Sequence, residues 1–129
     1  KPIDAETLEY IHTYKTGFLI RACIRCGGML GQANSRQLSA LSLFGSRIGH
    51  AFQIIDDILD ITGDEEQLGK NIGSDLNKDK ATYPALYGLE ESRRKAEELV
   101  EESIASLEEF DDRANPLREI ARFFVQRTF

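Results

Sequence analysis

Basic residues are the minority among the charges of this chain. Its 129 residues include 16 Lys and Arg against 22 Asp and Glu, which gives a formal net charge of −6. Proteins that bind nucleic acid usually carry a basic patch, so this balance argues against that class of partner. Apolar runs are also short, and none approaches the roughly 20 residues that a membrane-spanning helix needs. The sequence therefore predicts a globular protein with no nucleic-acid partner and no membrane span.

Cysteine and methionine are scarce. Cys23 and Cys26 are the only cysteines, and because no secretion signal precedes them we expect a cytoplasmic location. Met29 is the only methionine and the chain begins at Lys1, so we expect this sequence to be a piece of a longer protein.

Strand-like alternation is almost absent, and helical periodicity takes its place. The pattern predicts helices over residues 8–30, 34–63, 83–87 and 90–110, and a last helix that begins at 115. Asn34 followed by Gln37 predicts a capping box at the start of the second helix, and Gly63 marks its expected end. The first helix should bury a stripe of Leu8, Ile11, Phe18, Leu19, Ala22, Cys26 and Leu30. We therefore predict an all-α fold.

Three aspartates share one edge of the second predicted helix, near its expected C-terminus. Asp56, Asp57 and Asp60 stand three and four residues apart, a spacing at which like charges repel. With the unfavourable helix dipole, this repulsion costs on the order of 1–2 kcal/mol in a bare helix. A cation would offset that cost, and oxygen ligands that leave room for water and phosphate suit Mg²⁺. A solvated acidic helix end is the alternative interpretation of these residues.

The surroundings of the aspartates favour a phosphate ligand. Phe52 and Gln53 precede them on the same side of the helix, and Lys70 and Lys80 follow in a glycine-containing segment predicted to be a loop. Carboxylates, a divalent ion and ammonium groups together suit a diphosphate. Solvated loop lysines are the alternative interpretation.

Lys15 interrupts the apolar stripe of the first predicted helix, with Thr16 beside it. The pair predicts an ammonium and a hydroxyl that face a polar cavity, whereas a lysine whose head reaches the surrounding water is the alternative.

Three other motifs are set aside. The segment Gly63–Lys70 lacks the spacing, the Ser/Thr and the preceding strand of a P-loop. Cys23 and Cys26 form a single CxxC inside a predicted helix, which favours packing over zinc or redox chemistry. His12 and His50 have no Ser or Cys arrangement that would complete a triad.

Four motifs, taken together, resemble a known family. The runs are Phe52-Gln-Ile-Ile-Asp-Asp-Ile-Leu-Asp60, Gly69-Lys-Asn-Ile-Gly-Ser-Asp75, Lys80-Ala-Thr-Tyr-Pro84 and His12-Thr-Tyr-Lys-Thr-Gly17. In this order they resemble the farnesyl and geranylgeranyl diphosphate synthases of the trans-isoprenyl diphosphate synthase, or polyprenyl synthetase, family. The similarity spans nearly the whole chain and is greatest to bacterial short-chain synthases.

The resemblance implies a fold and an assembly. It implies that residues 1–129 are the C-terminal portion of a single polyprenyl synthetase domain whose N-terminal half is absent. That domain is a helical bundle around a large central cavity, usually a homodimer in the cytoplasm.

The resemblance also implies roles for individual residues. Asp56 would bind Mg²⁺, and Asp57 and Asp60 would complete that site directly or through water. Phe52 would face the reacting carbons. The diphosphate-binding side chains would be Lys15, Thr16, Gln53, Lys70 and Lys80, with Lys15 and Lys70 also catalytic. Asp75 would hold the lysine segment, and Arg127 matches a C-terminal basic residue only weakly.

The implied reaction condenses isopentenyl diphosphate with an allylic diphosphate in isoprenoid biosynthesis, as in a geranyltranstransferase. Magnesium and lysines draw charge onto the leaving diphosphate, the isopentenyl double bond attacks the allylic cation, and a proton is lost. The family's first aspartate-rich motif is missing, so we predict that this chain alone is inactive. Product length stays open. A terpene cyclase, a non-catalytic partner subunit and a metal-free helical interaction module are the alternatives.

Overall fold

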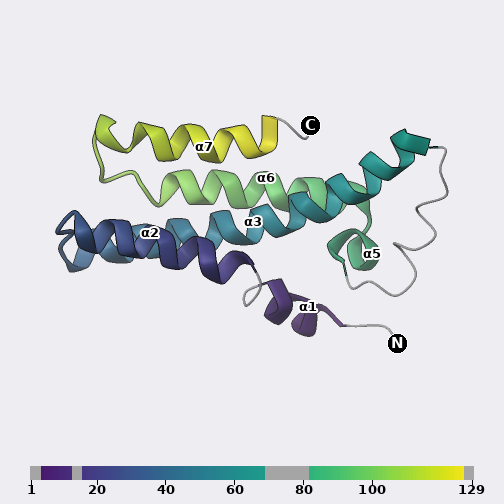
Figure 1. Ribbon diagram of the computed structural model, residues 1–129, viewed down its shortest axis with the longest axis horizontal. Coiled ribbons are helices and arrows are strands. Elements are labelled where there is room, and N and C mark those ends of the chain that lie inside the picture. Colours follow the sequence, from purple (N-terminus) through teal and green to yellow (C-terminus); the bar gives the residue numbers. More distant parts are fainter. Residues whose placement is uncertain (1–3, 13–15, 69–81, 127–129) are drawn as a thin grey trace.

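The structure is a computed structural model that describes residues 4–12, 16–68 and 82–126. Within these ranges every regular element is helical, which confirms the all-α prediction (Figure 1). The elements are α1 (Ala5–His12), α2 (Phe18–Leu30), α3 (Ser35–Leu68), α5 (Tyr83–Tyr87), α6 (Leu89–Ala105), the 3-10 turn η2 (Asp112–Ala114) and α7 (Asn115–Gln126). No helix in the described ranges combines the length and the apolar character needed to cross a bilayer.

Helix α3 is the central rod of the bundle. It packs against α2 on one side and α6 on the other, and α7 covers α6 (Figure 1). Because α3 has neighbours on two sides, its buried surface is wider than a single stripe. The side chains buried along it are Phe44, Ile48, Ala51, Ile54, Ile55 and Ile58, joined in the core by Ala96, Leu99, Val100, Leu107 and Ala121.

The predicted start of α3 is confirmed, whereas its predicted end is wrong. At its start the Asn34 amide donates to Gln37 Oε1 at 2.9 Å, and the Gln37 amide donates to Asn34 Oδ1 at 2.8 Å, so the predicted capping box is confirmed. The predicted end at Gly63 is wrong, because the helix continues to Leu68. Gly63 does not adopt the positive φ of a helix-ending glycine, and it is simply a helical residue here.

The first predicted helix is divided in two. Instead of one helix over residues 8–30, α1 ends at His12 and α2 begins at Phe18. Thr16 and Gly17 form a wider π-helical turn between them. Threonine and glycine are both poor helix formers, and π turns interrupt α-helices at such points.

Close backbone contact decides which face of α2 meets α3. A Cβ added to Gly45 would lie 3.0 Å from the Arg21 Cα, and one added to Gly49 would lie 3.0 Å from the Gly17 Cα. The backbones therefore approach closely at these two glycines, and Ile20 and Ile24 pack against the core.

The stripe predicted for the first helix is confirmed at Leu8, which is 1% exposed, but it is wrong for α2. Phe18, Leu19 and Leu30 are 52%, 62% and 86% exposed in the described structure. Cys23 and Cys26 are free and exposed, so the prediction that they pack in the core is also wrong.

Helix α6 ends earlier than predicted, at Ala105 instead of residue 110. Turns at residues 106–110 follow, and a side chain from α7 bonds the carbonyl groups there: Arg118 donates to the Leu107 and Phe110 oxygens, each at 2.8 Å. Helix α7 begins at Asn115, as predicted.

Candidate functional site

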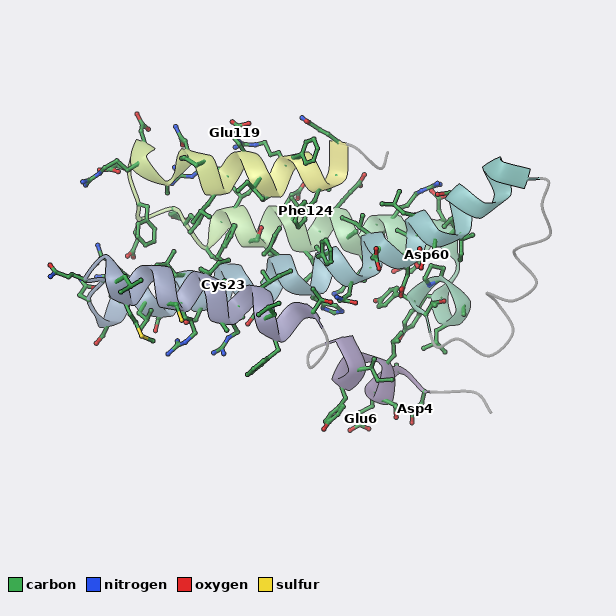
Figure 2. The ribbon with its side chains drawn as sticks, in the orientation of Figure 1. Asp4, Glu6, Cys23, Asp60, Glu119 and Phe124 are labelled. Atoms are coloured by element: carbon green, nitrogen blue, oxygen red, sulfur yellow. The ribbon has the colours of Figure 1, made fainter. Side chains whose placement is uncertain are left out.

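The acidic cluster lies in the interior of α3 and not at its end. The helix runs from Asp60 on to Leu68, so the dipole penalty assigned to a C-terminal position does not apply. Only the repulsion between neighbouring carboxylates remains, a few tenths of a kcal/mol per pair. Asp56 and Asp60 are exposed and lie one turn apart, and Figure 2 shows Asp60 on the part of α3 that meets α5.

Asp57 has different surroundings from its two neighbours. Its side chain is half-buried, and its Oδ2 accepts a hydrogen bond of 3.1 Å from the backbone amide of Tyr83, the first residue of α5. The sequence did not predict this contact. Thr82 and Pro84 are suited to a helix start, which was the available signal, but nothing in the sequence shows where that helix docks.

Gln53 is the buried polar residue of the predicted site, with 2% of its surface exposed. It lies one turn after Gly49 and one turn before Asp57 on the same face of α3. The Gly17 backbone covers that face at Gly49, and α5 covers it at Asp57. Gln53 therefore occupies the space between two backbone segments that are far apart in the sequence.

Thr16 is brought to this same face of α3. It precedes Gly17, whose Cα and carbonyl oxygen would lie 3.0 and 3.1 Å from a Cβ at position 49. The turn that carries Thr16 is thus held about one helical turn from Gln53. The predicted proximity of the Thr16 and Gln53 side chains stays a prediction.

Phe52 contacts the last helix. Its half-buried ring lies 5.6 Å from the ring of Phe124 in α7, centroid to centroid, with an interplanar angle of 51°. The sequence predicted an aromatic ring beside the acids but not this neighbour.

Several predicted site residues lie outside the described ranges. These are Lys15, Lys70 and Lys80, together with Asp75 and Arg127. Their proposed roles stay predictions.

The described residues contain no group of three or more His, Cys, Asp or Glu side chains placed to hold a metal ion. The described residues therefore do not supply a complete set of protein ligands for a metal ion. Magnesium, however, is commonly bound by one or two carboxylates, waters and substrate phosphates, and exposed Asp56 and Asp60 suit that mode.

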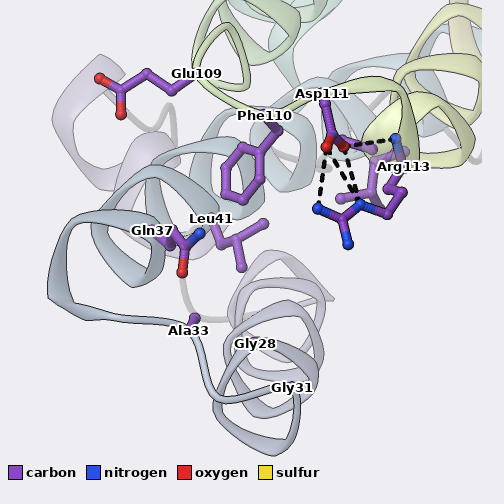
Figure 3. A pocket seen from close by; sticks show the side chains of 11 residues that line it. Gly28, Gly31, Ala33, Gln37, Leu41, Glu109, Phe110, Asp111 and Arg113 are labelled. Carbon is purple, nitrogen blue, oxygen red and sulfur yellow. Dashed lines mark hydrogen bonds and ion pairs between the residues drawn. The ribbon is translucent and has the colours of Figure 1, made fainter.

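A hollow of about 550 Å³ lies between the α2–α3 turn and the turns that follow α6 (Figure 3). Leu41, Phe110 and Leu117 line it, and Arg113 and Asp111 stand at its edge. The Arg113 side chain, with its backbone amide, donates hydrogen bonds to Asp111 and lowers the pKa of that carboxyl. Gln37, also in its wall, is roughly 30 Å along α3 from Asp56 at ~1.5 Å per residue, so this hollow is separate from the acids.

Comparison with known proteins identifies the family. The model of the polyprenyl synthetase family matches residues 1–120. The chain belongs to the polyprenyl synthetase family. It is 43% identical over 130 residues to the farnesyl diphosphate synthase of Escherichia coli (strain K12), an alignment that covers 98% of this chain and 43% of the relative.

Solved structures of synthases have the same fold as this polyprenyl synthetase chain. The apo structure of an FPP/GFPP synthase from Zymomonas mobilis matches with a TM-score of 0.82 and 35% identity, covering 96% of this chain and 39% of that one. A geranyltransferase from Helicobacter pylori complexed with magnesium and isoprenyl diphosphate matches with a TM-score of 0.71 and 31% identity, covering 99% and 42%. The chain thus spans about two fifths of the length of these proteins.

Proposed function

We propose that this chain supplies one wall of the active site of a magnesium-dependent prenyltransferase, which joins isopentenyl diphosphate to an allylic diphosphate. The observation that carries the proposal is the juxtaposition on α3. Exposed Asp56 and Asp60, half-buried Asp57 and buried Gln53 follow one another there, with the Thr16 turn held beside them. Family membership supports the reaction class and leaves the terpene cyclase alternative without support.

The aspartates are proposed to act as a metal-binding wall. Asp56 and Asp60, with Asp57 directly or through water, would hold Mg²⁺ from one side, and diphosphate oxygens would complete its coordination. The ion would neutralise charge on the leaving diphosphate. Two carboxylates at neighbouring turns of a rigid helix are already in position, so little conformational entropy is lost when the ligand binds.

The polar groups around the aspartates would orient the substrate. Gln53 is a buried polar side chain, and burial of an amide is costly unless its polar atoms are hydrogen-bonded. We propose that Gln53 and the Thr16 hydroxyl bond the allylic diphosphate with Lys15, Lys70 and Lys80. Phe52 would present its ring to the developing allylic cation, which an aromatic face stabilises.

The proposal extends to the whole protein. Residues 1–129 are proposed to form the C-terminal portion of a larger domain, because the chain covers only 43% of the E. coli relative. We also predict assembly as a homodimer and a cytoplasmic location. Product length stays open.

The alternative of a helical interaction module is favoured by one observation, the exposed apolar side chains Phe18, Leu19 and Leu30 on α2.

Calorimetry with Mg²⁺ and a non-hydrolysable allylic thiolodiphosphate separates the two functions. We expect metal-dependent binding by the wild-type chain and a loss of at least tenfold in affinity for D56N/D60N. The control E97Q/E101Q removes the same charge from an exposed pair at the same spacing on α6 and should bind normally. An interaction module would show no metal-dependent binding in any of the three proteins.

A further inference from the structure

Asp57 differs from the aspartates on either side by its contact with α5. Its Oδ2 accepts the backbone amide of Tyr83, 26 positions along the chain, at 3.1 Å. Asp56 and Asp60 are exposed, whereas Asp57 is half-covered. A bond from a backbone amide to a carboxylate is charge-assisted and stronger than one between neutral groups.

Tyr83 has a second contact on the same face of α3. Its ring meets the His50 ring edge-on, with centroids 6.3 Å apart and an interplanar angle of 73°. His50 and Asp57 are seven residues apart, which is two turns, so Tyr83 spans the stretch of α3 in which Gln53 lies. The first residue of α5 is therefore held on the stretch of α3 that contains Gln53.

Helix α5 has only five residues, and a helix of that length is unstable without tertiary contacts. Within it, Thr82 Oγ1 accepts the Ala85 amide at 3.2 Å and the Tyr83 and Tyr87 rings lie 4.5 Å apart. These are local contacts, which shape the turn but do not fix it on α3. The Asp57 bond and the Tyr83–His50 ring contact join it to α3, and α5 also packs against α6.

We propose that Asp57 is a positioning residue that anchors the first turn of α5 over Gln53. One Asp57 carboxylate oxygen is committed to the Tyr83 amide, whereas Asp56 and Asp60 are the exposed members of the cluster. The anchoring itself is independent of metal. Any effect that this anchoring has on substrate binding rests on the proposed function.

Amide hydrogen exchange in metal-free buffer tests the anchor. D57A should speed exchange at Tyr83 and along α5 by about tenfold relative to α6, the usual effect of losing one such bond. D57N keeps an acceptor oxygen at the same position and should remain within about threefold of the wild-type chain. D56N removes the same charge from the exposed neighbour and should leave α5 unchanged.

Two results would overturn the proposal. The first is an amide exchange rate at Tyr83 that increases in D57A by no more than the rate in α6 does. Global destabilisation alone would then account for the increase. The other is equal acceleration in D56N and D57A, which would assign the effect to cluster charge. If D57A does not fold, a measurement on the wild-type chain replaces it. We expect a through-hydrogen-bond scalar coupling between the Tyr83 nitrogen and the Asp57 carboxyl carbon. The absence of this coupling would contradict the anchor. Because no metal is present, a failed calorimetric test of the proposed function leaves this result unaffected.

Discussion

Arg118 of α7 bonds carbonyl groups in the turns that follow α6. It donates to the Leu107, Phe110 and Asp111 carbonyl oxygens and to Asn115 Oδ1, over 2.7–3.0 Å. A single guanidinium thus joins the turn after α6 to the first turn of α7. Its donors form a planar fork that can bond several acceptors at once.

Replacing Arg118 should therefore be costly. We expect R118M to lower the free energy of unfolding by about 2–3 kcal/mol, because half-buried carbonyls lose charged donors. Urea unfolding followed by circular dichroism measures this. R113M is the control: the Arg113 side chain is 91% exposed and pairs with Asp111, so its loss should cost under about 1 kcal/mol. Equal losses in the two variants would contradict the role given to Arg118.

Gly88, between α5 and α6, has a backbone conformation that other residues rarely adopt. Its φ is +90° and its ψ 161°. A Cβ there would meet nothing within 4 Å. Glycine is therefore favoured at this position by the backbone conformation and not by a lack of space.

The substitution G88A should destabilise the chain by about 1–3 kcal/mol through backbone strain. G27A offers the opposite case, because Gly27 lies inside α2 with open space around its Cβ position and should gain about 0.5–1 kcal/mol. Thermal unfolding should shift in opposite directions by a few degrees. A shift of the same sign in both variants would show that this conformational account of Gly88 is wrong.

At the scale of elements, the contact between α2 and α3 places the Thr16 turn. Gly17 backbone atoms lie 3.0–3.4 Å from the Cβ position of Gly49, and these atoms cannot yield as a flexible side chain would. The affinity of the site for diphosphate should therefore depend on a residue that contacts no ligand.

G49A should displace the Thr16 turn, lower magnesium-dependent affinity for the allylic thiolodiphosphate several-fold and cost about 1–3 kcal/mol of stability through overpacking. G63A, in the same helix with open space around its Cβ position, should leave affinity unchanged. The same calorimetric titration compares the two. Wild-type affinity in a folded G49A variant would contradict the placement of Thr16 by this contact.

How far the sequence predicted these elements depended on whether the signals were local. The capping box of α3 and the start of α7 rest on neighbouring residues and were found. The inward face of α2 depends on Gly45 and Gly49, which belong to another helix, and apolar periodicity predicted the wrong face. The turn after α6 is bonded by Arg118, eleven residues beyond the carbonyl of Leu107, a contact that the local sequence did not predict.

The site follows the same rule. The acids of α3, taken together with Gln53, Lys70, Lys80 and the Lys15–Thr16 pair, led to the prediction of a diphosphate wall. The sequence did not show that Asp57 bonds α5 whereas Asp56 and Asp60 are exposed. The contact between Asp57 and Tyr83 joins residues 26 positions apart, and no spacing rule gives a contact at that separation.

At the scale of the whole molecule, the chain is an antiparallel set of helices that carries one aspartate-rich motif. It spans 43% of the E. coli farnesyl diphosphate synthase, and its 129 residues contain no second DDxxD. The account predicts that the chain contributes half of an active site and needs the rest to act on substrate.

A chimera tests that claim most directly. The residues of the E. coli synthase that align with this chain would be replaced by it, and condensation of an allylic diphosphate with isopentenyl diphosphate would be measured with Mg²⁺. We predict turnover by the chimera, a loss of at least a hundredfold in its D56A variant, and none by the chain alone. Turnover by the chain alone, or a D56A chimera as active as its parent, would contradict the account.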